Sequence, residues 1–145
     1  MRPHGVPHPI DCVLGINYVC NSRCVMCDIW KVKTYPELRP EEYHKLPTTL
    51  RDINISGGET FLRRDIPDII RVVRERCRDA RIVISTNGFM PAFIESQMKK
   101  ILEIDPDIGV AISLDGVGDK HEEVRRIPQA YNKCIDTLTR LQKLG

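Results

Sequence analysis

The sequence has little that would direct it to a membrane or to a polyanion. Its 145 residues include 22 basic and 20 acidic side chains, so the net charge is only +2, and no run of Lys or Arg is longer than a pair. A balance this even argues against nucleic-acid binding and against capture by an anionic membrane surface as the main activity. No apolar run approaches the roughly 18–20 residues of a membrane span, so we expect no membrane partner.

The first ten residues also lack the apolar segment of a secretory signal. Residues 1–10 contain three prolines, and we interpret them as a proline-rich lead to a single domain over residues 11–145. We therefore expect a cytoplasmic protein. In a reducing compartment the six cysteines do not form a disulfide framework, and cysteines that crowd into one loop favour metal binding.

Four short apolar runs predict the strands of a parallel sheet. Residues 10–17, 53–55, 81–84 and 108–112 are rich in Ile and Val and are bounded by Gly, Asp or Asn. Such runs are typical of strands that are buried on both faces of the sheet. Helical patterns separate them, and this alternation predicts an α/β fold of four consecutive βα units with right-handed crossovers.

The helices are predicted from apolar stripes and from their start signals. We expect Asp65 to cap one helix, Pro91 to open the next and Pro128 to open the last. A shorter helix is predicted over residues 39–46. The inward stripe predicted for the last helix consists of Tyr131, Cys134, Ile135, Leu138 and Leu141.

A weak internal repeat places polar groups at the strand ends. An Ile-Ser pair recurs with its serine at positions 56, 85 and 113, at spacings of 29 and 28 residues, about one strand-loop-helix-loop unit. Ligands bind at the carboxyl ends of parallel strands, because the loops there converge. The loop that follows the first strand joins the same edge, so the sequence predicts one pocket built from four strand ends.

That first loop contains three cysteines within eight positions: Cys20, Cys24 and Cys27. On a helix this spacing would place all three on one face, as buried small apolar side chains. The intervening Asn21 and Ser22 favour a turn instead.

A structural zinc site is a second interpretation, but it requires a fourth ligand. The candidates lack the usual paired spacing of zinc ligands. They are Asp28, His44 and Cys12.

An iron–sulfur cluster is the third interpretation. A cubane cluster has four irons, each normally held by one thiolate. Three thiolates would leave one iron with open coordination positions, as in a reactive rather than a sealed metal site.

The cysteine segment, Cys20-Asn-Ser-Arg-Cys24-Val-Met-Cys27, resembles the CxxxCxxC signature of the radical S-adenosylmethionine (radical SAM) superfamily. The resemblance covers nearly the whole chain from Asp11 onward. The chain looks most like the subgroup whose members modify peptides or build cofactors. The resemblance continues in order through Gly57-Gly58-Glu59, Ser85-Thr-Asn-Gly88, Ser113-Leu-Asp-Gly116 and His121-Glu-Glu-Val-Arg125.

For the fold, the resemblance implies a partial TIM-like barrel. Radical SAM cores have six or more βα units, so the four predicted here would make a truncated core. We expect either a fragment or engineered core of a longer enzyme, or a small member completed by self-association. An unpaired edge on the fourth strand would allow such a homo-oligomer.

For activity, the resemblance implies that the amino and carboxylate groups of S-adenosylmethionine bind the open iron of a [4Fe-4S] cluster. One electron, supplied by a donor such as a flavodoxin or ferredoxin, then cleaves the cofactor to methionine and a 5′-deoxyadenosyl radical, which abstracts hydrogen from a substrate. The competing hypothesis is a non-catalytic metal-binding domain, with zinc or a bare cluster, that serves folding or partner contacts.

The same resemblance assigns the site residues. The three cysteines of the signature become the cluster ligands. The other three are expected to be structural for a different reason, since Cys77 and Cys134 lie on apolar helix stripes and Cys12 lies in a strand. The backbone of Met26 would contact adenine, Gly57 and Gly58 would admit the methionine portion closely, and Glu59 would lie near its ammonium group. The remaining cofactor contacts implied are Ser85, Asn87, Ser113, Asp115 and Arg125.

Overall fold

A computed structural model of the chain describes residues 7–33 and 36–145. Most of the predicted proline-rich lead, residues 1–6, lies outside the described residues. The four predicted strands are confirmed. They are β1 (Asp11–Gly15), β2 (Asp52–Ser56), β3 (Arg81–Thr86) and β4 (Gly109–Ile112).

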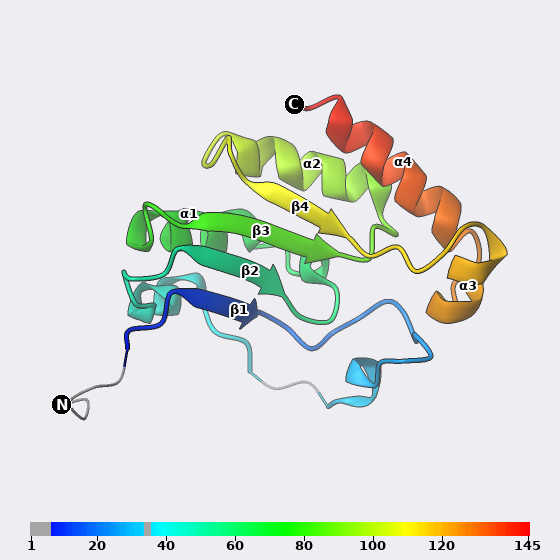
Figure 1. Ribbon diagram of the computed structural model, residues 1–145, viewed down its shortest axis with the longest axis horizontal. Coiled ribbons are helices and arrows are strands. Elements are labelled where there is room, and N and C mark those ends of the chain that lie inside the picture. Colours follow the sequence, from blue (N-terminus) through cyan, green and yellow to red (C-terminus); the bar gives the residue numbers. More distant parts are fainter. Residues whose placement is uncertain (1–6, 34–35) are drawn as a thin grey trace.

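The strands form one parallel sheet in the order β1-β2-β3-β4 (Figure 1). The register pairs Gly15 with Ser56, Ile55 with Ile84, and Ser85 with Ala111. All four strands therefore end at the same edge. Over residues 7–33 and 36–145 the sheet does not close on itself, as expected for a partial barrel.

The α-helices are α1 (Ile66–Arg76), α2 (Pro91–Leu102), α3 (Asp119–Arg125) and α4 (Ala130–Gln142). Helices α1 and α2 pack against one face of this sheet. Short 3₁₀ turns are η1 (Ile29–Lys31), η2 (Pro40–Lys45) and η3 (Thr60–Leu62). In Figure 1, α3 and the segment that contains η1 both lie beyond the carboxyl ends of the strands.

Alternation along the strands produces the core. Ile53, Ile55, Ile82 and Ile84 are buried, and they pack in one cluster with the apolar stripes of α1 and α2. A second, smaller cluster joins Phe89 to α4. Burial of these side chains holds the helices against the sheet, at about 25 cal/mol per Å² of apolar area removed from water.

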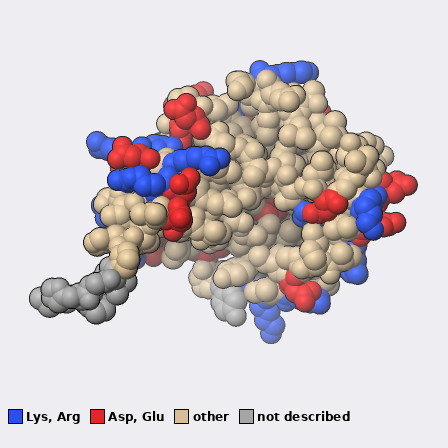
Figure 2. All heavy atoms as spheres, in the orientation of Figure 1, with Lys and Arg blue, Asp and Glu red and all other residues tan. Residues whose placement is uncertain are grey.

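The other face of the sheet is open in the part of the chain that the structure describes. Val13 is 74% exposed, and Asn54, Val83 and Ser85 on the neighbouring strands are only half-buried. The expectation that the strands are buried on both faces is therefore wrong for this chain. Figure 2 views the molecule in the orientation of Figure 1, with charges of both signs toward the ends and uncharged atoms between them.

Two helix starts differ from the prediction. Asp65 occupies the N-cap position of α1 but caps nothing with its side chain, because its carboxylate pairs with the guanidinium of Arg63 at 2.6 Å. The last helix begins at Ala130 rather than at Pro128, after Gln129 in a left-handed conformation (φ 59°). No helix among the described residues is long and apolar enough to cross a membrane.

Candidate metal centre

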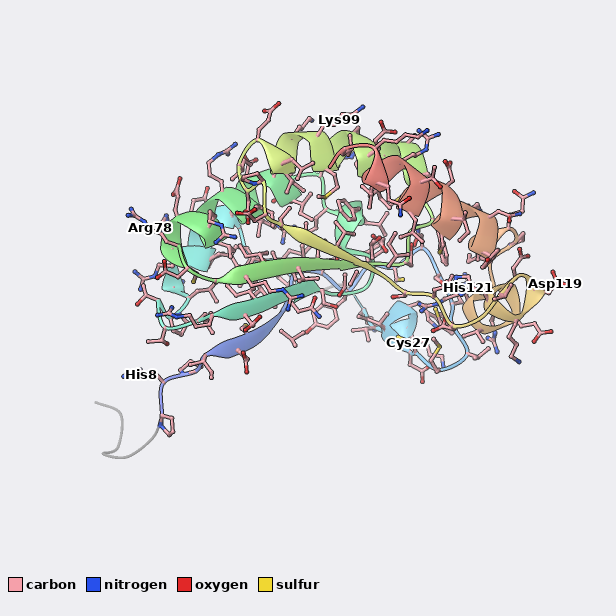
Figure 3. All side chains as sticks on the ribbon, turned by 45° about the horizontal axis from the view of Figure 1, so that its top comes forward. His8, Cys27, Arg78, Lys99, Asp119 and His121 are labelled. Atoms are coloured by element: carbon pink, nitrogen blue, oxygen red, sulfur yellow. The ribbon has the colours of Figure 1, made fainter. Side chains whose placement is uncertain are left out.

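A cavity of about 170 Å³ lies where the four strands end. The cysteine loop, the two glycines after β2 and the polar residues at the ends of β3 and β4 all contribute to its wall. Its lining residues are Cys20, Ser22, Cys24, Cys27, Ile29, Ser56, Gly57, Gly58, Ser85, Thr86, Asn87, Ser113 and Arg125. Figure 3 shows Cys27 and His121 at this end of the sheet and Arg78 at the opposite end.

The cysteine loop is fixed by hydrogen bonds to elements that follow it much later in the sequence. The side chain of Asn87 donates to Asn21 at 2.7 Å. The hydroxyl of Ser22 donates to the carbonyl of Arg125 at 2.8 Å, and the N–H of Val25 donates to a carbonyl of α3 at 2.9 Å. These bonds position the loop by contacts within the protein.

The three cysteines of this loop differ in exposure. Cys24 is buried, Cys20 is half-buried and Cys27 is exposed. Burial raises the pKa of the Cys20 thiol, and the N–H of Ser22 partly opposes this. Among the described residues, no three His, Cys, Asp or Glu side chains converge on one metal ion. Three thiols spread around one cavity suit a cubane cluster, in which each iron takes its own thiolate.

The glycine pair is required by the close approach of the backbone that follows β1. A Cβ on Gly58 would lie 2.1 Å from the carbonyl oxygen of Val19, and one on Gly57 would lie 2.4 Å from the side-chain oxygen of Asn17. Gly57 also has φ +153°, which side-chain-bearing residues rarely adopt. Asn17 accepts from the N–H of Gly58 at 3.1 Å and donates to the carbonyl of Glu59 at 2.9 Å.

The carboxylate of Glu59 lies behind the cavity wall. Glu59 is fully buried. Its carboxylate accepts hydrogen bonds from the N–H of Phe61 at 3.1 Å, the hydroxyl of Thr86 at 2.7 Å and the N–H of Asn87 at 2.8 Å. Burial raises the pKa of this carboxyl, while the three donors oppose the shift. In the structure Glu59 therefore braces the loop after β3 and does not line the cavity.

A second chain of contacts runs from that loop to α3. The carbonyl of Asn87 lies 3.1 Å from the sulfur of Cys134, which lies 3.5 Å from Nε2 of His121. Nδ1 of His121 accepts from the N–H of Asp115 at 3.1 Å, so the neutral ring carries its proton on Nε2. Burial and then the charge of Arg125 lower the pKa of His121. The side chain of His121 is fully buried, so this histidine at the start of α3 is part of the packed interior.

Arg125 connects α3 to the cysteines. Its Nε donates to the carboxylate of Asp115, and its Nη1 lies 3.6 Å from the sulfur of Cys24. Burial lowers the pKa of the guanidinium, but the hydrogen bond and charge of Asp115 outweigh this and raise it. A permanent positive charge therefore stands at the wall of the cavity.

Most of the predicted site residues meet at this cavity. The exceptions are Met26, which is 58% exposed, and Glu59 and Asp115, which support residues of the wall. Cys77 and Cys134 are buried away from the lining, as predicted, and Cys12 packs at the edge of the core. The sequence reasoning missed Ser22 and Ile29 in the wall, and Asn17 behind it.

Comparison with curated proteins finds relatives of several kinds. Over 134 residues, or 87% of this chain, it is 32% identical to the Fe-coproporphyrin III synthase of Methanosarcina barkeri. It is 23% identical over 93% of its length to the sporulation killing factor maturation protein SkfB of Bacillus subtilis. It is 36% identical over 52% of its length to the GTP 3′,8-cyclase of Photorhabdus laumondii.

In each case the match covers about a third or less of the relative. The shares are 32%, 33% and 26% of the three proteins, in the same order. The sequence model of the Radical SAM superfamily matches residues 15–145. The chain therefore belongs to the radical SAM superfamily, whose members use a [4Fe-4S] cluster and S-adenosylmethionine.

Proposed function

We propose that the chain is a radical SAM module in which Cys20, Cys24 and Cys27 hold a [4Fe-4S] cluster with one open iron. The observation that carries the proposal is their meeting in one cavity with the ends of β2, β3 and β4. S-adenosylmethionine bound at the open iron would be cleaved reductively, which supplies a radical for hydrogen abstraction. As a structural metal site has no use for this polar wall, the non-catalytic alternative is not favoured.

The chain's own residues would bind and orient the cofactor. Gly57 and Gly58 expose backbone at the cavity, where polar groups can approach closely. Hydroxyl and amide groups of Ser85, Asn87 and Ser113 can hydrogen-bond ribose or amino-acid atoms. Glu59 and Asp115 would act through Asn87 and Arg125, by holding them in place.

The family implies a reductant, and the surface of the site suits one. Cys27 is exposed, so one side of the cluster would lie close to solvent, where an electron donor such as a flavodoxin or ferredoxin could dock. We also infer that the outer edge of β4 allows self-association, because unpaired strand edges favour pairing with another chain.

The substrate is not singled out by the relatives. Their names refer to a coproporphyrin, to the maturation of a killing factor and to GTP. Since the chain covers about a third or less of each, the proposal extends to cofactor cleavage and hydrogen abstraction only.

Anaerobic reconstitution tests the proposal. The chain is loaded with iron and sulfide, reduced with dithionite and mixed with S-adenosylmethionine, and 5′-deoxyadenosine is then measured. We expect four irons per chain and formation of 5′-deoxyadenosine. One tightly bound zinc with no cluster would refute the proposal in favour of a structural metal domain.

Cysteine variants assign the ligands. Cys24→Ala should lose the iron and the brown colour of the cluster, because it removes one of three thiolates. The matched control is Cys77→Ala, which removes a buried thiol that faces the carbonyl of Pro47 at 3.5 Å, away from the cavity. Iron retained in Cys24→Ala would show that the ligand assignment is wrong.

A further inference from the structure

Two polar groups lie close to the sulfur of Cys24, and a cysteine that only binds iron does not need them. The hydroxyl of Ser22 lies 3.1 Å from the sulfur, and Nη1 of Arg125 lies 3.6 Å from it. Ser22 is only 2% exposed, and the side chain of Arg125 is 12% exposed. Both contacts are therefore largely shielded from water, where polar interactions are stronger than at the surface.

The two neighbours are themselves tied together. The hydroxyl of Ser22 donates to the backbone carbonyl of Arg125 at 2.8 Å, while the guanidinium is held through Nε by the carboxylate of Asp115. Arg125 is therefore anchored at both its backbone and its side chain. This leaves Nη1 aimed at the sulfur without the freedom of an exposed arginine.

The charge of this arginine has a definite expected effect. Reduction of an iron–sulfur cluster adds one negative charge, and hydrogen bonds to the sulfurs and the local charge set its potential. A cation that donates to a ligand sulfur favours the reduced form. The carboxylate of Asp115 opposes this effect, because it adds a negative charge on the far side of the guanidinium.

We propose that Arg125, oriented by Asp115 and Ser22, donates to the sulfur of Cys24 and raises the reduction potential of the cluster before any S-adenosylmethionine binds. This rests on the proposed function, since it requires the cluster. It differs from the expectation that Arg125 contacts the carboxylate of the cofactor, because it predicts an effect in the cofactor-free protein.

The test is an EPR-monitored redox titration of the reconstituted chain without S-adenosylmethionine. Arg125→Gln should lower the midpoint potential, with about a tenfold loss in the one-electron reduction equilibrium, or about 59 mV. Asp115→Asn should shift the potential in the opposite direction, since its amide oxygen can still accept from Nε while the negative charge is gone. Arg126→Gln is the matched control, because that neighbour is exposed and should leave the potential unchanged.

The variants also separate this inference from the proposed function. If the wild-type chain assembles no four-iron cluster, the proposed function fails first. If the cluster forms but Arg125→Gln has the wild-type potential and only weaker binding of S-adenosylmethionine, the inference is overturned. A lowered potential in Asp115→Asn would also contradict it.

Two milder variants test the role of Arg125 if the Arg125→Gln protein does not bind the cluster. Arg125→Lys keeps the charge but loses the planar donor geometry, and Ser22→Ala removes the hydroxyl. Each should lower the potential by less than the roughly 59 mV expected for Arg125→Gln. Wild-type potentials in both variants would refute the role assigned to Arg125.

Discussion

Individual buried polar side chains hold the strand ends of this protein together. The carboxylate of Glu59 accepts hydrogen bonds from Phe61 after β2, from Thr86 at the end of β3 and from Asn87. The hydroxyl of Thr86 also accepts from the N–H of Gly88 at 3.1 Å, and the residue is 3% exposed. Its single hydroxyl thus satisfies a carboxylate and a backbone donor that water cannot reach.

Thr86→Val should therefore destabilise the protein by about 1–3 kcal/mol, because the shape is kept while a buried N–H loses its acceptor and the carboxylate loses a donor. Urea unfolding of the unloaded chain measures the change. Thr139→Val serves as the control, since that exposed hydroxyl bonds only within α4. Equal stability of Thr86→Val and the wild type would contradict the bracing role of Glu59.

His121 makes stability depend on pH. Its pKa is lowered in the folded protein, whereas an unfolded histidine has a pKa of about 6.5. The unfolded state thus gains a proton first as the pH falls. The stability that the neutral ring contributes is present above pH of about 6.5 and is lost as the pH falls below it, by at most about 1.4 kcal/mol per pH unit.

His121→Asn tests this pH dependence. The asparagine oxygen can replace Nδ1 as the acceptor for the N–H of Asp115, but it has no proton to gain. Urea unfolding at pH 7.5 and 5.5 should show a smaller loss for the variant than for the wild type. His44→Asn, at an exposed position, is the control. Parallel losses in all three proteins would contradict the assignment.

At the scale of elements, the strands and the first residues of α1 and α2 were predictable, because their signals are local. The last helix was not. Its predicted inward stripe included Ile135 and Leu138, which are 39% and 37% exposed, whereas Cys134 and Thr137 are fully buried. Periodicity identifies an apolar face, but α4 packs on α2 and α3 beyond the sheet edge. Which side is covered depends on contacts between distant segments.

Truncation of apolar side chains should follow the observed packing and not the predicted stripe. Ile70→Ala in α1, at a fully buried position, should cost about 2–5 kcal/mol. Ile135→Ala in α4 should cost less than about 1 kcal/mol, as for partly exposed positions. Chemical denaturation of both variants measures this, and a larger loss at Ile135 would show that the predicted stripe was right.

The candidate site, like the helices, was only partly predictable from the sequence. The cysteine triplet and the strand-end motifs can be recognised by spacing, so the sequence predicted Cys20 and Gly58 as site residues, and both line the cavity. The supporting roles of Asn17, Ser22 and His121 were not. Asn17 and Ser22 act through contacts with segments 41 and 103 residues away. The burial of His121 depends on how α3 packs against α4, which no local pattern indicates.

For the whole molecule, the open edge of the sheet is the feature of greatest consequence. Beside β4 lies a largely apolar groove of about 500 Å³, which α2 and α4 flank. Its lining includes Leu102, Val110, Leu138 and Leu141. The outer edge of β4 pairs with no strand in the described part of the chain, and exposed apolar surface next to such an edge favours association.

Sedimentation velocity over a range of concentrations tests this self-association. We expect the wild-type chain to form dimers as its concentration rises, and Leu138→Lys to remain monomeric because it introduces a charge into the groove. Leu38→Lys, at an exposed site outside the groove, should behave as the wild type. A monomer at every concentration would refute association through this edge.

The central claim, that three cysteines leave one iron open to S-adenosylmethionine, is tested most directly by pulsed EPR. The reduced, reconstituted chain is measured with and without cofactor labelled with ¹⁵N in its amino group. The account predicts a changed spectrum and a hyperfine coupling between the cluster and the labelled nitrogen. A four-iron cluster whose spectrum does not change with saturating S-adenosylmethionine would contradict it.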